Sequence, residues 1–124
     1  MTVVLDTNAL MMPVEADLRL FDELDRLLSS PDPLVPRAVV TELEKLAAGR
    51  GREATAARVG LDLSERCEIR ETAAEYADDA VVELAVAEHC PAVTNDRPLA
   101  GRLLDEGVSV IGLRGKNKLA ITHP

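Results

Sequence analysis

Aromatic residues are almost absent from this chain. Of its 124 residues only Phe21 and Tyr76 are aromatic, and there is no tryptophan. Proteins that bind single-stranded nucleic acid by stacking its bases use several aromatic side chains along a groove. The composition therefore almost excludes a platform of that kind.

Cysteine and long apolar segments are also scarce. Cys67 and Cys90 are too few for a disulfide scaffold, and they suit the reducing environment of the cytoplasm. No apolar run approaches the roughly 20 residues of a membrane-spanning helix. The opening residues MTVVLD lack the basic and apolar regions of a secretory signal. We therefore expect one cytoplasmic domain over residues 1–124 that makes no use of a membrane.

Several catalytic motifs are missing as well. The chain has no Gly-x-Ser-x-Gly sequence, which disfavours a hydrolase triad with His89 or His123. It has no Gly-x-Gly-x-x-Gly sequence and no P-loop after its first apolar run, which disfavours nucleotide cofactors. The cysteines and histidines do not have the spacing of a zinc site, so buried structural thiols are the simpler interpretation.

The chain carries a formal net charge of −8, and this charge is unevenly distributed. Residues 62–88 hold nine acids and two bases, as expected for a solvated helix face. Residues 97–118 hold five bases and two acids, which makes them the better candidate for contact with phosphate. A protein this acidic binds nucleic acid only through local basic patches or metal ions.

Short apolar runs alternate with stripes of helical periodicity along the chain. This alternation predicts an α/β domain built around a mostly parallel sheet of about five strands. The expected strands are 3–5, 34–35, 67–70, 91–94 and 108–111, and the expected helices are 15–28, 39–47, about 52–63, 80–87 and 98–107.

Five acidic residues fall where predicted strands end or helices begin. Asp6 follows the first strand, Asp96 follows the strand ending near Thr94, and the other three open helices. In a parallel α/β sheet, ligands bind beyond the carboxyl ends of the strands. Converging carboxylates are the oxygen ligands that Mg²⁺ or Mn²⁺ prefers, and such an ion can activate water for phosphodiester hydrolysis. The remaining three acids are Glu42, Asp78 and Asp79.

Each of these acids also has a structural interpretation. Asp6, Asp78, Asp79 and Asp96 are all placed to cap a helix or to interact with its dipole. Glu42 lies on an amphipathic helix, where a glutamate is usually solvated. Taken singly, each acid is better explained by structure than by function. Their common position at one edge of the sheet favours a site.

Four short motifs, in this order, resemble those of PIN domains. They are Val4-Leu5-Asp6-Thr7-Asn8-Ala9-Leu10, Thr41-Glu42-Leu43, Asp79-Ala80-Val81-Val82, and Thr94-Asn95-Asp96 followed by Arg97-Pro98-Leu99. The resemblance covers essentially the whole chain. It implies a three-layer α/β/α nuclease fold that cuts RNA with Mg²⁺ or Mn²⁺.

The same resemblance implies the roles of individual residues. The ligand positions are Asp6, Glu42, Asp79 and Asp96, with Asn8 and Thr94 as polar support. Asp78 is the alternative to Asp79, because either neighbour in a helix could face the cleft. We favour Asp79, which directly precedes the apolar run. RNA phosphates would be held by some of Arg50, Arg52, Arg97, Arg114, Lys116 and Lys118.

Two branches of the family compete for this chain. The segment from Val108 to Leu119 looks more like the endonucleases that process ribosomal RNA, which would give a ribosome-assembly partner. The neighbouring branch contains VapC-like toxin ribonucleases, which are often dimers and are inhibited by a small antitoxin. A catalytically silent module that binds RNA or protein is the rival from another class. We favour RNA processing, and a homodimer is compatible with either branch.

Overall fold

The strands are β1 (Thr2–Leu5), β2 (Asp32–Pro36), β3 (Glu68–Arg70), β4 (Ala92–Val93), β5 (Val110–Arg114) and β6 (Lys118–Thr122). In the computed structural model, which describes all 124 residues, they form one sheet in the order β3-β2-β1-β4-β5-β6. All neighbours are parallel except β5 and β6. The predicted mostly parallel sheet is confirmed, with six strands instead of about five.

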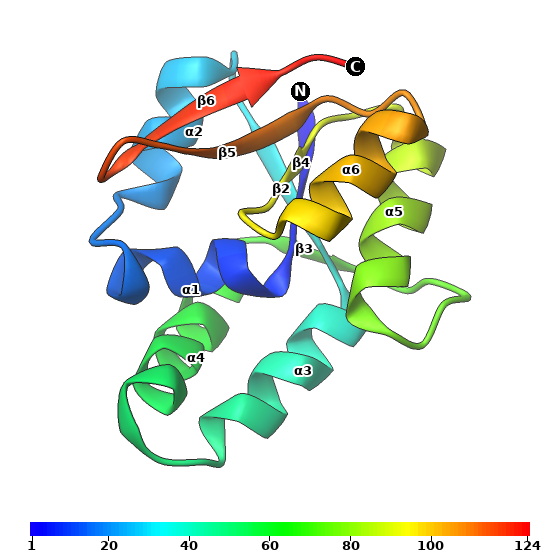
Figure 1. Cartoon of the computed structure of the whole chain (residues 1–124). Coiled ribbons are helices and arrows are strands. Elements are labelled where there is room, and N and C mark those ends of the chain that lie inside the picture. Colours follow the sequence, from blue (N-terminus) through cyan, green and yellow to red (C-terminus); the bar gives the residue numbers. More distant parts are fainter.

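The helices are α1 (Thr7–Glu15), α2 (Leu20–Leu27), α3 (Arg37–Ala47), α4 (Gly51–Ser64), α5 (Ala77–Glu88) and α6 (Arg97–Asp105). Figure 1 shows α5 and α6 together on one side of the sheet and α1, α2 and α4 on the other. Helix α3 contacts both α4 and α5. The predicted three-layer sandwich is therefore confirmed. No helix combines the length and the apolar character needed to cross a membrane.

The central strand β1 lies in the middle of the core. Val3, Val4 and Leu5 are completely buried, as expected for a parallel strand covered on both faces. They belong to a cluster of 30 buried residues that joins both helical layers. On one side α1 packs closely against α4, because Gly60 has no side chain: a Cβ there would lie 3.0 Å from the Leu10 carbonyl oxygen.

The sheet reverses its direction of growth between β1 and β4. From β1 the chain adds β2 and then β3 on one side, whereas it later adds β5 and β6 beyond β4 on the other. Ligands of open α/β sheets bind at such a reversal, beyond the carboxyl ends of the strands. Leu5 of β1 is in register with Val93 of β4. Asp6 and Thr94 therefore leave the sheet side by side at this point.

The structure differs from the sequence prediction in its N-terminal helices. The predicted helix over residues 15–28 is wrong in its first part, because α1 ends at Glu15 and α2 begins only at Leu20. Between them Asp17 has a φ of 49°, a left-handed conformation that a helix does not continue through. Helix α1 was not predicted, because its residues 9–12 are all buried and show no amphipathic stripe.

The last strand was also not predicted. The segment after Arg114 forms a hairpin with the strand before it: β6 pairs with β5, with Val110 opposite Thr122 at one end and Arg114 opposite Lys118 at the other. Gly115 allows the turn, with a φ of 73° that other residues rarely adopt. Lys116 thus lies at the tip of a hairpin and Lys118 begins a strand.

Candidate active site

Asp6 is the most deeply buried acid of the chain. Its side chain caps α1, accepting a hydrogen bond from the Ala9 amide to Oδ1 at 2.7 Å. Burial raises the pKa of Asp6 to about 7, and the negative charges of Asp78 and Asp96 add to this effect. The hydrogen bonds from Thr94 and Ala9 act in the opposite direction. A buried carboxyl with a perturbed pKa at the sheet reversal marks a candidate functional site.

The neighbouring acids Asp78 and Asp79, at the start of α5, have different surroundings. The Arg102 guanidinium donates a hydrogen bond from Nη2 to Oδ1 of Asp79 at 2.8 Å. Asp78 has no ion pair of this kind. Partial burial raises the pKa of Asp78, as do the charges of Asp96, Glu42 and Asp79, while Arg102 lowers it. The structure therefore groups Asp78 with Asp96 and Glu42 and gives Asp79 a basic partner in Arg102.

Asp96 begins α6 and is fixed by backbone contacts. Its Oδ1 accepts a hydrogen bond from the Leu99 amide at 2.9 Å, and its own amide donates to Thr94 Oγ1 at 3.0 Å. The next amide, that of Asn95, donates to Asn8 Oδ1 of α1 at 2.9 Å. Asn8 thus ties the loop after β4 to the start of α1, while Thr94 holds the loop itself. Capping occupies Oδ1 of Asp96 and leaves its Oδ2 without a hydrogen bond in the protein.

Four acids therefore form one electrostatic group, which we call the acidic group: Asp6, Glu42, Asp78 and Asp96. They come from the ends of β1 and β4 and from α3 and α5. Thr7, next to Asp6, is buried, and its hydroxyl oxygen has no hydrogen-bond partner. No three acidic, histidine or cysteine side chains lie close enough together to hold a metal ion in this arrangement.

The donor chemistry of the acidic group nevertheless fits Mg²⁺ or Mn²⁺. All four side chains offer carboxylate oxygens, the ligands that these ions prefer. The charges of Asp78 and Asp96 raise the pKa of Asp6, and those of Asp96 and Glu42 raise the pKa of Asp78, so a bound cation would offset this repulsion. The unpartnered hydroxyl of Thr7 adds a further oxygen beside Asp6.

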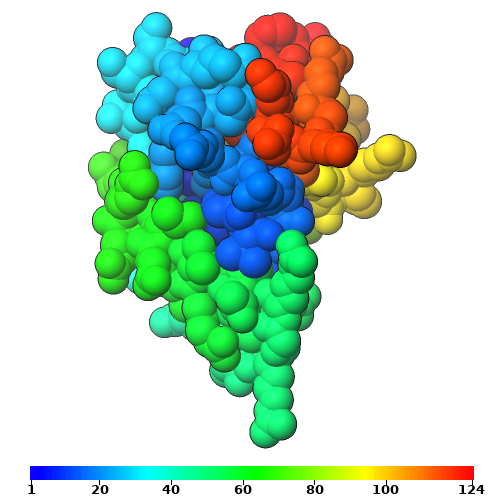
Figure 2. Space-filling model, turned by 90° about the vertical axis from the view of Figure 1, so that its left-hand side faces the viewer, coloured from blue at the N-terminus to red at the C-terminus, as the bar shows by residue number.

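Two shallow grooves flank the loop after β4. One, of about 240 Å³, runs from Thr94 and Asp96 past Arg97 to Arg114 at the end of β5. The other, of about 230 Å³, lies between Asn95 and the residues of α1. Figure 2 shows α1 (blue), the β4–α6 loop (yellow) and the β5–β6 hairpin (orange-red) meeting on this face. Two exposed arginines therefore border the surface next to Asp96.

The other predicted RNA-binding residues lie elsewhere. Arg50 and Arg52 are at the start of α4, beyond the turn that joins it to α3. Arg52 donates a hydrogen bond to the Val14 carbonyl at 2.9 Å and so ties α4 to the end of α1. The groove beside Asp96 is lined by neither of these arginines, nor by Lys116 or Lys118.

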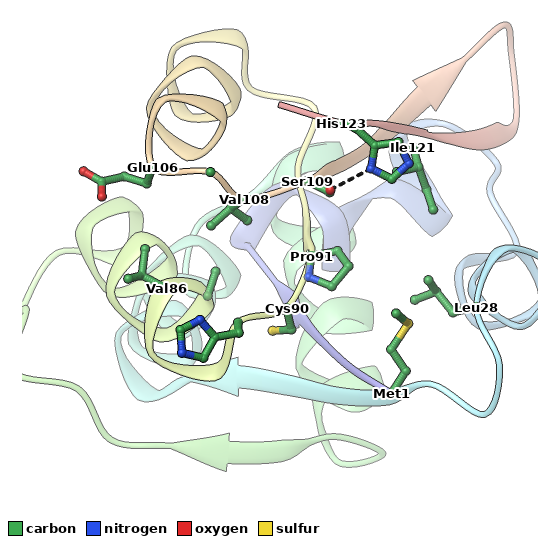
Figure 3. Close-up of a pocket in the computed structure, with 13 residues that line it drawn as sticks. Met1, Leu28, Val86, Cys90, Pro91, Glu106, Val108, Ser109, Ile121 and His123 are labelled. Atoms are coloured by element: carbon green, nitrogen blue, oxygen red, sulfur yellow. Dashed lines mark hydrogen bonds between the residues drawn. The ribbon is translucent and has the colours of Figure 1, made fainter.

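A further cavity, of about 450 Å³, lies at the opposite edge of the sheet, where the strands begin. It is lined by Met1, Pro91 and Ser109, which precede β1, β4 and β5 (Figure 3). Ser109 Oγ lies 2.9 Å from His123 Nδ1, but no carboxylate is hydrogen-bonded to this histidine. Burial raises the pKa of the Cys90 thiol in the same cavity. This edge therefore lacks an activated nucleophile, in agreement with the absence of a triad motif.

Sequence reasoning missed Arg102 and Thr7 as parts of the site. Nothing in the sequence links Arg102 to Asp79, 23 positions earlier, since their contact depends on how α5 and α6 pack. Thr7 lies within the first motif, but only the structure shows that its hydroxyl is buried without a partner.

A model of a known family, described as a PIN like domain, matches residues 3–116. The chain belongs to the PIN-like domain family. The predicted resemblance is thereby confirmed over nearly the whole length of the chain. This PIN-like domain is 35% identical over 108 residues to Ribonuclease VapC9 of Archaeoglobus fulgidus, an alignment that spans 86% of this chain and 78% of that protein.

Two further relatives match this PIN-like domain almost from end to end. It is 27% identical over 124 residues to Ribonuclease VapC4 of Methanocaldococcus jannaschii, covering 96% of this chain and 95% of the relative. The solved structure of the PIN domain endonuclease Utp24 superposes with a TM-score of 0.79 at 27% identity, covering 99% of this chain and 92% of that one. Fold and sequence therefore agree on the family.

Proposed function

We propose that this protein is an endoribonuclease that hydrolyses phosphodiester bonds in RNA and depends on Mg²⁺ or Mn²⁺. The observation that carries the proposal is the buried Asp6 carboxyl, whose pKa is raised to about 7 by burial and by the facing acids Asp78 and Asp96. The names of its relatives, two ribonucleases and a PIN domain endonuclease, support the same activity.

We assign the ion to Asp6, Asp78 and Asp96, with Glu42 assisting. When bound, the ion supplies a Lewis acid for the phosphoryl oxygens and lowers the pKa of water. Asp79, which we first favoured as the ligand, becomes in this proposal the partner of Arg102. The protein's own contribution is rigidity, because capping hydrogen bonds hold Asp6 and Asp96 in place before any ligand arrives.

RNA phosphates are held beside this site by Arg97 and Arg114 in our proposal. Both border the groove that contains Asp96, so a strand in this groove would pass the acidic group. Arginine contacts of this kind position the backbone without reading the sequence. Arg50, Arg52, Lys116 and Lys118 are lesser candidates, because none of them lines this groove.

The test is cleavage of an end-labelled single-stranded RNA with Mn²⁺, with EDTA, and with the Asp6→Asn variant. We expect cleavage only by the unmodified protein with the ion. Activity that survives both EDTA and Asp6→Asn would overturn the mechanism. RNA binding without any cleavage would instead favour a silent PIN-fold binding module.

For the cellular role we propose RNA processing in the cytoplasm, with a ribosome-assembly partner. The resemblance of the segment from Val108 to Leu119 to endonucleases that process ribosomal RNA supports this choice, as does the basic hairpin from Arg114 to Lys118. The second candidate is a toxin ribonuclease with an antitoxin partner, which the 35% identity to Ribonuclease VapC9 favours. Expression of the protein alone in a bacterial host separates them: a toxin arrests growth, and Asp6→Asn relieves the arrest. A homodimer is proposed for either role.

A further inference from the structure

Tyr76 is the most exposed large apolar side chain of the protein. It is 76% exposed, although it lies directly before α5, two positions from Asp78. The only other aromatic residue, Phe21, is half-buried and packs under the Arg66 guanidinium at 4.0 Å from its ring centre. Tyr76 is therefore the only aromatic ring of the chain that is largely exposed to solvent.

The loop that presents Tyr76 is fixed by hydrogen bonds to α5. The Glu83 carboxylate accepts the amides of Ala73 and Ala74 at 2.9 and 3.0 Å. The Tyr76 carbonyl accepts the Ala80 amide at 2.9 Å, within the first turn of the helix. The backbone at Tyr76 is therefore already ordered, and a ligand that stacks on the ring would not have to order the loop.

The position of the ring relates it to the acidic group. Consecutive Cα atoms are about 3.8 Å apart, so the Cα atoms of Tyr76 and Asp78 are separated by at most about 7.6 Å. The phosphate and base of one nucleotide are separated by a similar distance, so a nucleotide whose phosphate reaches Asp78 can bring its base to Tyr76. Any base has a π face, so one aromatic ring can hold it whatever its identity.

We propose that Tyr76 stacks on one base of the RNA, next to the phosphate that is cleaved. The proposal rests on the endoribonuclease function proposed above and adds its first contact with a base. A row of aromatic residues is absent from this chain, so the contact is limited to one nucleotide. Arg97 and Arg114 hold the backbone, and Tyr76 fixes the rotation of one base beside the acidic group.

The chain offers an unusually direct readout, because Tyr76 is its only tyrosine and there is no tryptophan. Intrinsic tyrosine fluorescence therefore reports on this ring alone. The experiment titrates a short single-stranded RNA into the Asp6→Asn variant, which binds without cutting. We expect the fluorescence to be quenched as the RNA binds, and to be quenched less when an abasic sugar replaces the stacked base.

Variants separate stacking from other effects. Tyr76→Ala lowers RNA affinity about 5- to 150-fold, the range for one lost base–aromatic stack, whereas Tyr76→Phe keeps the affinity because it keeps the ring. Val86→Ala is the matched control: Val86 is the exposed apolar residue near the other end of α5, 38% exposed and lining the opposite cavity. It should bind RNA like the parent. Since Tyr76 is exposed, unfolding temperatures should be unchanged.

The outcomes distinguish this proposal from the one on which it rests. RNA binding without quenching, or with equal affinity for Tyr76→Ala and Tyr76→Phe, overturns stacking and leaves the nuclease function intact. A loss of affinity in Tyr76→Phe as large as in Tyr76→Ala assigns the effect to the hydroxyl and also overturns stacking. Absence of both RNA binding and cleavage in the unmodified protein overturns the proposed function and this inference together.

Discussion

The Glu23 carboxylate accepts a hydrogen bond from the Leu119 amide at 2.8 Å, across 96 positions of the sequence. Arg26 forms an ion pair with the same Glu23 carboxylate and donates a hydrogen bond to the Leu119 carbonyl at 2.6 Å. Leu119 lies in β6, the edge strand of the sheet. The Leu119 amide and carbonyl would otherwise have no hydrogen-bond partner at this edge. The Glu23–Arg26 ion pair of α2 therefore satisfies both groups and covers the edge strand.

This contact predicts the effect of Glu23→Ala. The variant leaves the amide of the buried Leu119 without a hydrogen-bond partner and Arg26 without its carboxylate. We therefore expect the free energy of unfolding to fall by about 1–2 kcal/mol. Urea unfolding at pH 7 measures the change. Asp22→Asn is the control, because the pair of Asp22 with Arg19 is solvated and its atoms are 3.9 Å apart. Equal losses in both variants would contradict a specific role of Glu23.

The same contact predicts a pH dependence of stability. The Arg26 and Leu119 hydrogen bonds lower the pKa of Glu23 to about 2, from an ordinary value of 4.5. As the pH falls, Glu23 is therefore protonated more readily in the unfolded chain than in the folded protein. The stabilisation present above pH 4.5 is lost as the pH falls towards 2. We expect the stability difference between the unmodified protein and Glu23→Gln to shrink over this range. A difference that stays constant from pH 6 to about pH 2 would contradict the lowered pKa.

The raised pKa of Asp6 predicts the opposite pH dependence of stability. Because burial raises its pKa from 3.8 to about 7, the folded protein holds a proton that the unfolded chain has lost. Stability contributed in this way is present below pH 3.8 and is lost as the pH rises to about 7. We therefore expect Asp6→Asn to stabilise the metal-free protein at pH 8, by up to about 4 kcal/mol.

Thermal unfolding with and without Mn²⁺ checks this prediction. In EDTA the Asp6→Asn variant should melt several degrees above the unmodified protein, and Asp25→Asn, an exposed acid on α2, should not. Mn²⁺ should raise the melting temperature of the unmodified protein and so reduce the difference between its melting temperature and that of Asp6→Asn. A variant that melts lower than the unmodified protein at pH 8 would show that Asp6 is stabilising as a carboxylate.

Much of the fold could be predicted because its signals are local. The apolar run 3–5 and the alternation of strands with helices follow from residues near one another, and they placed Asp6 and Asp96 at one edge of the sheet. Helix α1 escaped prediction because burial on all sides removes the periodicity by which helices are recognised. Strand β6 escaped because its partners, β5 and Glu23, become neighbours only after folding.

The choice within the Asp78–Asp79 pair shows the same limit at the site. Both acids lie in the first turn of α5, and the sequence motif favours Asp79. Which one joins the acidic group depends on the rotation of α5 and on Arg102, contributed by another helix. Spacing along the chain holds no information about that rotation.

This choice gives a prediction for the two neighbours. We expect Asp78→Asn to reduce Mn²⁺-dependent cleavage at least about 100-fold, more than the roughly 10- to 100-fold cost of losing a residue that only orients a metal ligand. Asp79→Asn should reduce it less, because it removes only the partner of Arg102. The measurement is single-turnover cleavage of labelled RNA at saturating Mn²⁺. A larger loss for Asp79→Asn than for Asp78→Asn would restore Asp79 as the ligand.

The contact between α1 and α4 provides a test of the scaffold that holds Asp6. A Cβ at position 60 would lie 3.0 Å from the Leu10 carbonyl oxygen and 3.3 Å from the Leu10 Cβ. Because backbone atoms cannot move aside as a flexible side chain does, Gly60→Ala must push α1 away from α4. We expect a loss of stability of about 1–3 kcal/mol. Since Asp6 caps the start of α1, cleavage should fall as well.

Gly101→Ala is the matched control, a glycine within α6 around which a Cβ would meet nothing within 4 Å. Alanine is the better helix former by roughly 0.5–1 kcal/mol, so this variant should be as stable as the parent or more so. Urea unfolding of both variants, beside their cleavage rates, separates backbone crowding from helix propensity. If Gly60→Ala instead gained stability as Gly101→Ala does, the close approach of α1 and α4 would not be the contact that holds α1 and the buried Asp6 carboxylate in place.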